Sequence, residues 1–317
     1  ARLHMGQFSV TILTATGSVL GDIQQARTLG EELINVLPVE SAKQAILAIE
    51  RLDNDDLPLA LILDPIREAT AAGAGALLAQ REGSRQTYLV IDIGAGTTDV
   101  TGFVCVHSAK TGGLTVAEYK NAADAKKMAG NVLDSALERL VLQKSGLAEG
   151  TEEYRVAQLY LRRDKRFLKE QLFAQEKVAV ELPNDDVMTI ELSEFLRFAP
   201  VVRFADAIKQ LVAKCAAASR GKQSRIKLIA TGGGARLPVI AEIAEFGLEF
   251  EGVHINFTVQ DPMPDEIRVL HPDLIAPYPQ ISVALGGSMP ITPKQITDLS
   301  EALDVPPPRT IMPNYKS

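Results

Sequence analysis

The sequence predicts an α/β protein with a mainly parallel sheet to which antiparallel hairpins are added. Short β-branched and apolar runs alternate with longer stretches whose apolar residues recur at helical spacing. The run 59–63 is apolar at every position, which is typical of a strand buried on both faces of a parallel sheet. At 317 residues the chain is long enough for two domains or one two-lobed domain, since a domain averages roughly 150 residues.

Strands are expected where short apolar or alternating runs are bounded by glycine, proline or polar turn residues. A glycine turn separates the runs 87–93 and 100–107, and a loop at 108–113 leads into a third run at 114–119. Two alternating runs flank the turn residues 183–186, which predicts a second hairpin. The predicted strands are 8–14, 59–63, 87–93, 100–107, 114–119, 178–182, 187–192, 226–231 and 253–257.

Helices are expected where apolar residues follow a capping residue at a spacing of three and four. Asp22 and Ser41 can cap the first two, and Ser193 is expected to cap a long helix that ends near Ala218. The helix 153–172 is strongly basic and is interpreted as carrying a solvated face. The predicted helices are 22–36, one starting at 41, 68–78, 132–142, 153–172, 193–218 and 238–246, and an extended tail is expected over 305–317.

Composition excludes several classes of protein. Hydrophobic residues at 46% and charged residues at 23% are typical of a globular chain rather than a disordered one. The net charge of −7 argues against general nucleic-acid binding, and no apolar run is long enough to cross a bilayer. Two cysteines, Cys105 and Cys215, cannot form a disulfide framework, and no secretory signal is visible. We therefore expect reduced cysteines, a cytoplasmic location, and neither a membrane span nor a nucleic-acid partner.

The segment 92–99 is the first motif that carries chemistry. Its glycines let backbone N–H groups approach an anion closely, and its two threonine hydroxyls can donate further hydrogen bonds. Asp92 ends the preceding strand, where a carboxylate can hold a hydrated Mg²⁺ beside phosphates. A plain β-hairpin with a glycine turn is the alternative interpretation. The candidate residues of this motif are Asp92, Gly94, Ala95, Gly96, Thr97, Thr98 and Asp99.

The segment 231–238 is the second motif, and it lies between a predicted strand and a helix that Pro238 opens. Its three glycines, Gly232, Gly233 and Gly234, permit a flat nucleobase or ribose to lie against bare backbone. Arg236 can stack over such a base. A tight strand-to-helix connection is the alternative.

The segment 67–75 is the third motif, in which a carboxylate precedes a run of small residues. Glu68 can act on a water molecule or on a hydrated metal ion. The small residues that follow at helical spacing allow two helices to cross closely. Taken alone, this segment is better explained as an ordinary alanine-rich core helix.

Together and in this order, the three motifs resemble those of the actin-like ATPase superfamily, which includes actin, DnaK-type heat-shock chaperones, MreB and sugar kinases. Residues 92–99 are similar to its second phosphate-binding hairpin, 231–238 to its adenosine motif, and 68–75 to its first connecting helix. Residues 282–287 are similar to its second connecting helix. The resemblance covers about 41–289.

The resemblance implies an actin-like ATPase (ribonuclease H-like) fold with a nearly complete second lobe. The first lobe is expected to be truncated or degenerate, because the family's first phosphate-binding hairpin is not identifiable here. A remnant of that lobe is assigned to 1–78 and ends in the connecting helix. The second lobe is assigned to 79–290, with an inserted helical and hairpin subdomain at about 120–225, and a C-terminal helix and the proline-rich tail to 291–317.

The resemblance also implies ATP or ADP and Mg²⁺ as cofactors. It makes Asp92 and Glu68 the catalytic candidates, with Asp92 also the metal-binding residue. Further nucleotide contacts are implied at Ala129, Gly130, Asn131, Asp134, Lys169 and Glu170. With only one phosphate-binding hairpin identifiable, weak or absent turnover is expected.

Three functions follow from these observations. The first is a DnaK-like or MreB-like ATP-binding module that couples its nucleotide state to lobe closure and to a protein partner or self-association. The second is a non-catalytic scaffold that retains the actin-like lobe. The third is a small-molecule kinase of the same superfamily.

Overall fold

The computed structural model describes residues 67–79, 85–107, 113–219, 225–287, 289, 291 and 293–298. They form an α/β structure with a mixed sheet, as predicted. Two compact units are present. The sheet unit comprises the described residues up to Asp92, Asp99–Ala125 and those from Val212 onward. The inserted unit comprises Ile93–Thr98 and Lys126–Leu211.

A seven-stranded sheet with the order β7-β8-β6-β1-β2-β3-β9 organises the sheet unit. β8, β6 and β1 run parallel, β9 runs parallel to β3, and β7 is antiparallel to β8. β1 and β2 are neighbours joined by a four-residue turn, which requires them to be antiparallel. The strands are β1 (Arg85–Ile93), β2 (Thr98–His107), β3 (Leu114–Lys126), β6 (Arg225–Thr231), β7 (Leu248–Phe250), β8 (Val253–Gln260) and β9 (Lys294–Ile296).

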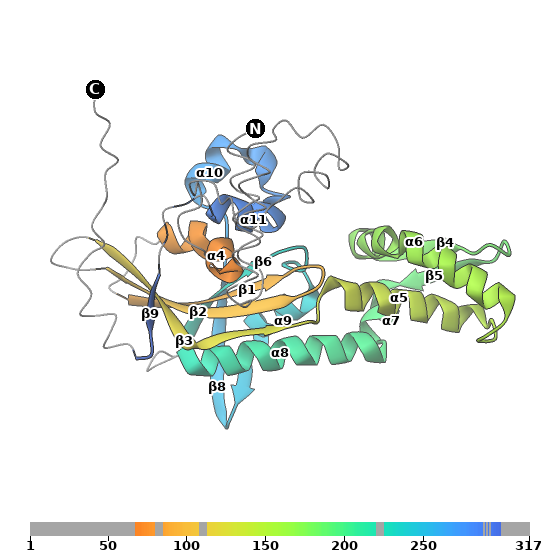
Figure 1. Ribbon diagram of the computed structural model, residues 1–317, viewed down its shortest axis with the longest axis horizontal. Coiled ribbons are helices and arrows are strands. Elements are labelled where there is room, and N and C mark those ends of the chain that lie inside the picture. Colours follow the sequence, from red (N-terminus) through yellow and green to blue (C-terminus); the bar gives the residue numbers. More distant parts are fainter. Residues whose placement is uncertain are drawn as a thin grey trace, which may run out of the picture. The chain divides into compact units, whose positions relative to one another are not determined.

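Two helices cross closely over one face of this sheet, as Figure 1 shows for α4 (Glu68–Leu78) and α11 (Tyr278–Gly286). A Cβ on Gly286 would stand 1.7 Å from the carbonyl oxygen of Ala71, so only glycine fits at the crossing. A Cβ on Gly73 would lie 2.5 Å from Val90 of β1. The small residues of α4 therefore allow the close helix crossing that the sequence suggested, and they seat the helix directly on the sheet.

The end of α8 (Ala199–Ser219) packs on the sheet through β2. A Cβ on Gly102 of β2 would lie 2.6 Å from Cβ of Ser219. Gly102 alternates with Phe103, which packs among the core residues of α4, so Ser219 and α4 contact opposite faces of β2. The remaining helices of this unit are α9 (Pro238–Phe246), α10 (Asp265–Leu270) and the 3₁₀ turn Pro272–Leu274.

The inserted unit consists of helices and one two-stranded hairpin. Its elements are α5 (Gly130–Ser145), α6 (Glu152–Gln175), β4 (Lys177–Glu181), β5 (Val187–Glu191) and α7 (Leu192–Arg197), with the first part of α8. Glu138 of α5 is buried and holds α6 through Arg162 at 3.4 Å and Lys165 at 3.2 Å. An edge-to-face contact of 6.1 Å between Phe173 and Phe195 joins α6 to α7.

Most described elements match the predicted ones, and α4 and α9 match at both ends. The single helix expected over 193–218 is wrong: α7 ends at Arg197, Phe198 is extended, and α8 begins at Ala199. Pro200 explains the break, because inside a continuous helix its ring would clash with the carbonyl of Leu196. Ser193 therefore lies inside α7 rather than capping it, since the N-cap position is Glu191.

Several elements were not anticipated, namely β7, α10, the 3₁₀ turn and β9. β3 continues seven residues beyond the predicted end, to Lys126. Within 291–317, where a helix was expected, the described residues 294–296 form strand β9 instead. The expected elements at 8–14, 22–36, from 41 and 59–63, and the tail over 305–317, lie outside the described residues. None of the helices in the described part of the chain has both the length and the apolar character that a bilayer crossing requires.

Candidate functional site

Two parallel strands end side by side at the first part of the site. Asp92 of β1 is in register with Thr231 of β6, and both side chains are buried. Thr231 Oγ1 donates a hydrogen bond to Asp92 Oδ1 at 3.1 Å. The glycine-rich segments 94–97 and 232–234 therefore begin at adjacent strand ends, the edge of an α/β sheet where ligands commonly bind.

Three carboxylates of the sheet unit influence one another at this edge. Burial, together with the charges of Asp92 and Asp99, raises the pKa of Glu68 to about 7. The pKa of Asp92 is raised to about 6, mainly by burial and also by the charge of Asp99, while the hydrogen bond from Thr231 acts to lower it. Raised values of this kind, with a stated partner charge, are typical of functional sites.

The start of α4 is fixed by a buried acid on β3. Arg67 Nη1 lies 2.7 Å from Glu118 Oε1, and Thr70 Oγ1 donates to Glu118 Oε2 at 3.3 Å. Burial raises the pKa of Glu118, while Arg67 lowers it. These contacts flank Glu68 on both sides along the chain and hold the first turn of α4 against the sheet.

The loop after β6 exposes its middle glycine. Gly232 has φ of 77°, a conformation that favours glycine, and its N–H donates to the carbonyl of Pro279 at 2.6 Å. Gly233 is exposed, and a Cβ built on it would meet nothing within 4 Å. Arg236 donates to the carbonyl of Ala276 at 3.3 Å. The loop is thus held at one end while Gly233 presents open backbone.

The turn 94–97 and the start of α5 form a second cluster, within the inserted unit. Gly94 N–H donates to the carbonyl of Thr97 at 3.0 Å, which closes the turn. The N–H groups of Gly130 and Asn131 donate to the carbonyls of Gly94 and Ala95 at 3.1 and 2.8 Å. These two helix N–H groups are therefore engaged by the turn, and Ala95 and Gly96 remain exposed.

Thr98 has a structural contact. Its hydroxyl donates to the carbonyl of Met128 at 2.7 Å, and the side chain is fully buried. Thr97 is only partly buried. Of the two adjacent threonines, Thr97 is thus the more exposed one.

Lys169 belongs to the second cluster, whereas Glu170 points elsewhere. Lys169 Nζ lies 2.6 Å from Asp134 Oδ1 and within 3.5 Å of the carbonyl of Gly130. Glu170 pairs with Arg166 at 3.0 Å on the solvent side of α6. The structure brings Lys169, Gly130 and Asn131 together with the turn 94–97, but it does not bring Glu170 to them.

The candidate residues therefore fall into two clusters, one in each unit. Asp92, Asp99, Glu68 and the 232–236 loop belong to the sheet unit, and the turn 94–97, the start of α5 and Lys169 belong to the inserted unit. Placement of one nucleotide against both clusters stays a prediction. Asp134, which the resemblance also implied as a contact, completes the second cluster through its salt bridge with Lys169. Pro279 completes the first but was not among the candidates, because a carbonyl acceptor leaves no local sequence signal.

A metal contact at the carboxylate cluster stays a prediction. Among the described residues, no group of three or more histidine, cysteine, aspartate or glutamate side chains is arranged to enclose a metal ion. Mg²⁺ commonly keeps several waters and binds through one or two carboxylates together with phosphates. The raised pKa values of Glu68 and Asp92 come first from burial and then from neighbouring carboxylates, and a cation bound beside them would lower both values.

Both cysteines are free and buried, as predicted. Burial raises the pKa of each thiol to about 12, so neither is a reactive thiolate at neutral pH.

Comparison of the sequence with protein-family models found no family that matches, and comparison with curated proteins found no matching relative. The fold and the two clusters therefore carry the functional argument.

Proposed function

We propose that this protein is a nucleotide-binding module of the actin-like ATPase class, taking ATP or ADP with Mg²⁺. The observation that carries the proposal is the Asp92–Thr231 hydrogen bond, which joins the strand ends from which both glycine-rich segments start. The crossing of α4 and α11 over the sheet supports the same class, since these helices correspond to the two connecting helices of the resemblance.

In this proposal the sheet unit supplies the metal-side and adenosine contacts. Asp92 holds a water of the hydrated Mg²⁺, and Glu68, with its pKa near 7, can accept a proton from a water molecule. Bound Mg²⁺ would neutralise charge on the phosphate oxygens. The exposed backbone of Gly233 receives the ribose or the base, and Arg236, three residues further along the same loop, is available for stacking.

For the inserted unit taken by itself, the resemblance implies phosphate contacts at the turn 94–97. The exposed Ala95 and Gly96 allow phosphate oxygens to approach the backbone, and Thr97 adds a hydroxyl. Lys169 contributes positive charge, although Asp134 already compensates part of it. A cytoplasmic location, where ATP is abundant and thiols stay reduced, is part of the proposal.

A thermal-shift experiment tests the proposal. The full chain is heated with ATP, ADP or adenosine, each with and without Mg²⁺, because a ligand that binds only the folded state raises the melting temperature. We expect a rise with ADP and ATP that is larger when Mg²⁺ is present. The matched variant Asp92→Asn should keep the adenosine response and lose the Mg²⁺ dependence. No shift with any of the three ligands at about 1 mM would refute the proposal and favour the scaffold alternative.

A further inference from the structure

Helix α6 carries a seam of residues on its exposed face. Glu153, Val156, Tyr160, Arg163 and Phe167 are spaced alternately by three and four, so they line one side of the helix. Val156, Tyr160 and Phe167 are 41%, 36% and 66% exposed, so three large apolar side chains lie along one exposed helix face. The opposite face, with Ala157, Leu161 and Leu172, is the one packed into the inserted unit.

Charge along this seam is divided between its two ends. The first turn of α6 is acidic, and both of its acids, Glu152 and Glu153, are exposed. The second half is basic at the surface, with Arg163 71% exposed and Arg166 also exposed. Arg163 contacts Asp164 and lies 5.1 Å from the ring of Tyr160, and an exposed pair of this kind stabilises little, so its guanidinium can turn to a better partner.

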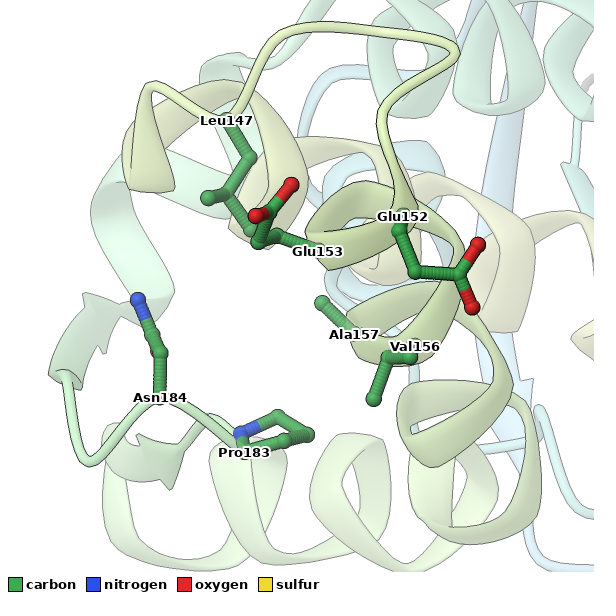
Figure 2. Close-up of a pocket in the computed structure, with 7 residues that line it drawn as sticks. All are labelled: Leu147, Glu152, Glu153, Val156, Ala157, Pro183 and Asn184. Atoms are coloured by element: carbon green, nitrogen blue, oxygen red, sulfur yellow. The ribbon is translucent and has the colours of Figure 1, made fainter.

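A hollow of about 180 Å³ lies beside the acidic end of the seam. Figure 2 shows that it is bordered by the first turns of α6, by Leu147 and by the turn of the β4–β5 hairpin at Pro183 and Asn184. Leu147, Val156, Ala157 and Pro183 give it an apolar lining. A cavity of about 150 Å³ lined by apolar side chains is large enough for a benzene ring, so this hollow can receive a phenylalanine side chain.

The seam has an acidic first turn, an apolar middle and a basic second half. A second copy of the seam running antiparallel therefore places basic residues opposite acidic ones. We propose that this face of α6 is an interface between two copies of the chain, in which the two α6 helices pack antiparallel about a twofold axis. Such an isologous contact uses the same surface on both copies, and each interaction occurs twice. One partner thereby supplies both the opposite charges and a side chain that fills the hollow.

The charges select one register for this pair. A twofold axis passing by Gln158 sets Glu153 opposite Arg163 of the other copy and Val156 opposite Tyr160. Phe167 then lies opposite position 149 of the other copy, between Leu147 and Glu152, which both line the hollow. Shifting the pair by one heptad would instead set Glu153 opposite Glu170, and the like charges would repel.

One pair of helices buries less surface than the roughly 1,200–2,000 Å² of a standard stable interface. We therefore expect a reversible dimer with a dissociation constant of about 10 μM to 100 μM. Sedimentation velocity of the full chain without nucleotide, from about 1 μM to about 300 μM, measures this equilibrium directly. A chain that stays monomeric over the whole range would overturn the inference and leave the proposed nucleotide site untouched.

Two phenylalanines provide a matched pair of variants. Phe167 on α6 is 66% exposed and Phe246 at the end of α9 is 67% exposed, so neither substitution should disturb folding. Phe167→Glu is expected to weaken dimerisation at least about tenfold, while Phe246→Glu leaves it unchanged. Equal effects of the two changes, or no effect of Phe167→Glu, would show that another surface mediates association.

Charge reversal then tests the register. Glu153→Arg and Arg163→Glu should each weaken the dimer, because each sets like charges opposite one another twice. The double variant restores opposite charges and should return to within about threefold of the unmodified chain. Failure of the double variant to recover, with circular dichroism showing all variants folded, would exclude the antiparallel register.

Discussion

Thr231 donates its hydroxyl hydrogen to the carboxylate of Asp92 at 3.1 Å, and this bond joins the ends of β6 and β1. Both residues are buried, with Asp92 4% exposed and Thr231 fully covered. This bond positions the start of both glycine-rich segments, because Gly94 follows Asp92 by two residues and Gly232 follows Thr231 by one.

Replacing Thr231 with valine keeps the shape of the side chain and removes the donor. The buried carboxylate of Asp92 then loses its hydrogen bond, and we expect unfolding free energy to fall by about 1–3 kcal/mol at neutral pH. Urea unfolding monitored by circular dichroism measures the change. Thr231→Ser, which retains the donor, should lose clearly less. Equal losses for valine and serine would assign the effect to packing rather than to the bond.

The raised pKa values of Asp92 and Glu68 make stability depend on pH. Their carboxyls have pKa values of about 6 and about 7 in the folded protein, against 3.8 and 4.5 ordinarily, so the folded state holds more protons between these limits. Stability contributed by these groups is present at low pH and is lost as pH rises through about 6 to 7.

Asp92→Asn removes one of these groups and should reduce the loss of stability that occurs as pH rises. We expect the variant to gain stability relative to the unmodified chain when urea unfolding is compared at about pH 8 rather than at about pH 5. Comparing the two proteins at each pH cancels the contribution of all other titrating groups. A difference between them that stays constant with pH would mean that Asp92 titrates near its ordinary value.

The crossing of α4 and α11 leaves no room for a side chain at Gly286. Because its Cβ would stand 1.7 Å from backbone of Ala71, Gly286→Ala should destabilise the protein by about 1–3 kcal/mol or more. Gly233→Ala is the matched control, since its Cβ meets open space, and it should leave the melting temperature unchanged. Similar melting temperatures for the two variants would contradict the close crossing.

Lys169 and Asp134 form a largely buried pair, with side chains 15% and 8% exposed. Lys169→Met leaves the carboxylate of Asp134 without its cation and should cost about 1.5–3 kcal/mol. Adding Asp134→Asn removes the stranded charge and should recover much of that loss. The double variant also separates stability from binding: recovered folding with weak ADP binding would identify Lys169 as a ligand contact, and recovered binding would make it structural.

Local sequence patterns were sufficient for most of the described elements. The small residues of α4 predict its close packing, and the apolar run before Asp92 predicts a buried strand, because both signals are contained in a few consecutive positions. The break at Phe198 was also readable, through Pro200, but the apolar periodicity on both sides of it favoured one helix.

Contacts between distant positions could not be read in this way. The pairing of Lys169 with Asp134 and the bond from Gly232 to Pro279 depend on how separate elements pack, which no local pattern specifies. The short strands β7 and β9 have three residues each and gain their order from β8 and β3, their neighbours in the sheet. Glu170 is next to Lys169 in the sequence, yet it lies on another side of the helix, because consecutive helical residues point in different directions.

Isothermal titration of ADP with Mg²⁺ into the full chain and into Gly233→Val tests the central claim most directly. Valine adds side-chain atoms where the exposed backbone would receive the nucleotide, in a position that is open in the structure. The account predicts measurable binding to the unmodified chain and at least about tenfold weaker binding to the variant, with the same melting temperature for both free proteins. Equal affinity in a folded Gly233→Val protein, or no binding to the unmodified chain, would contradict it.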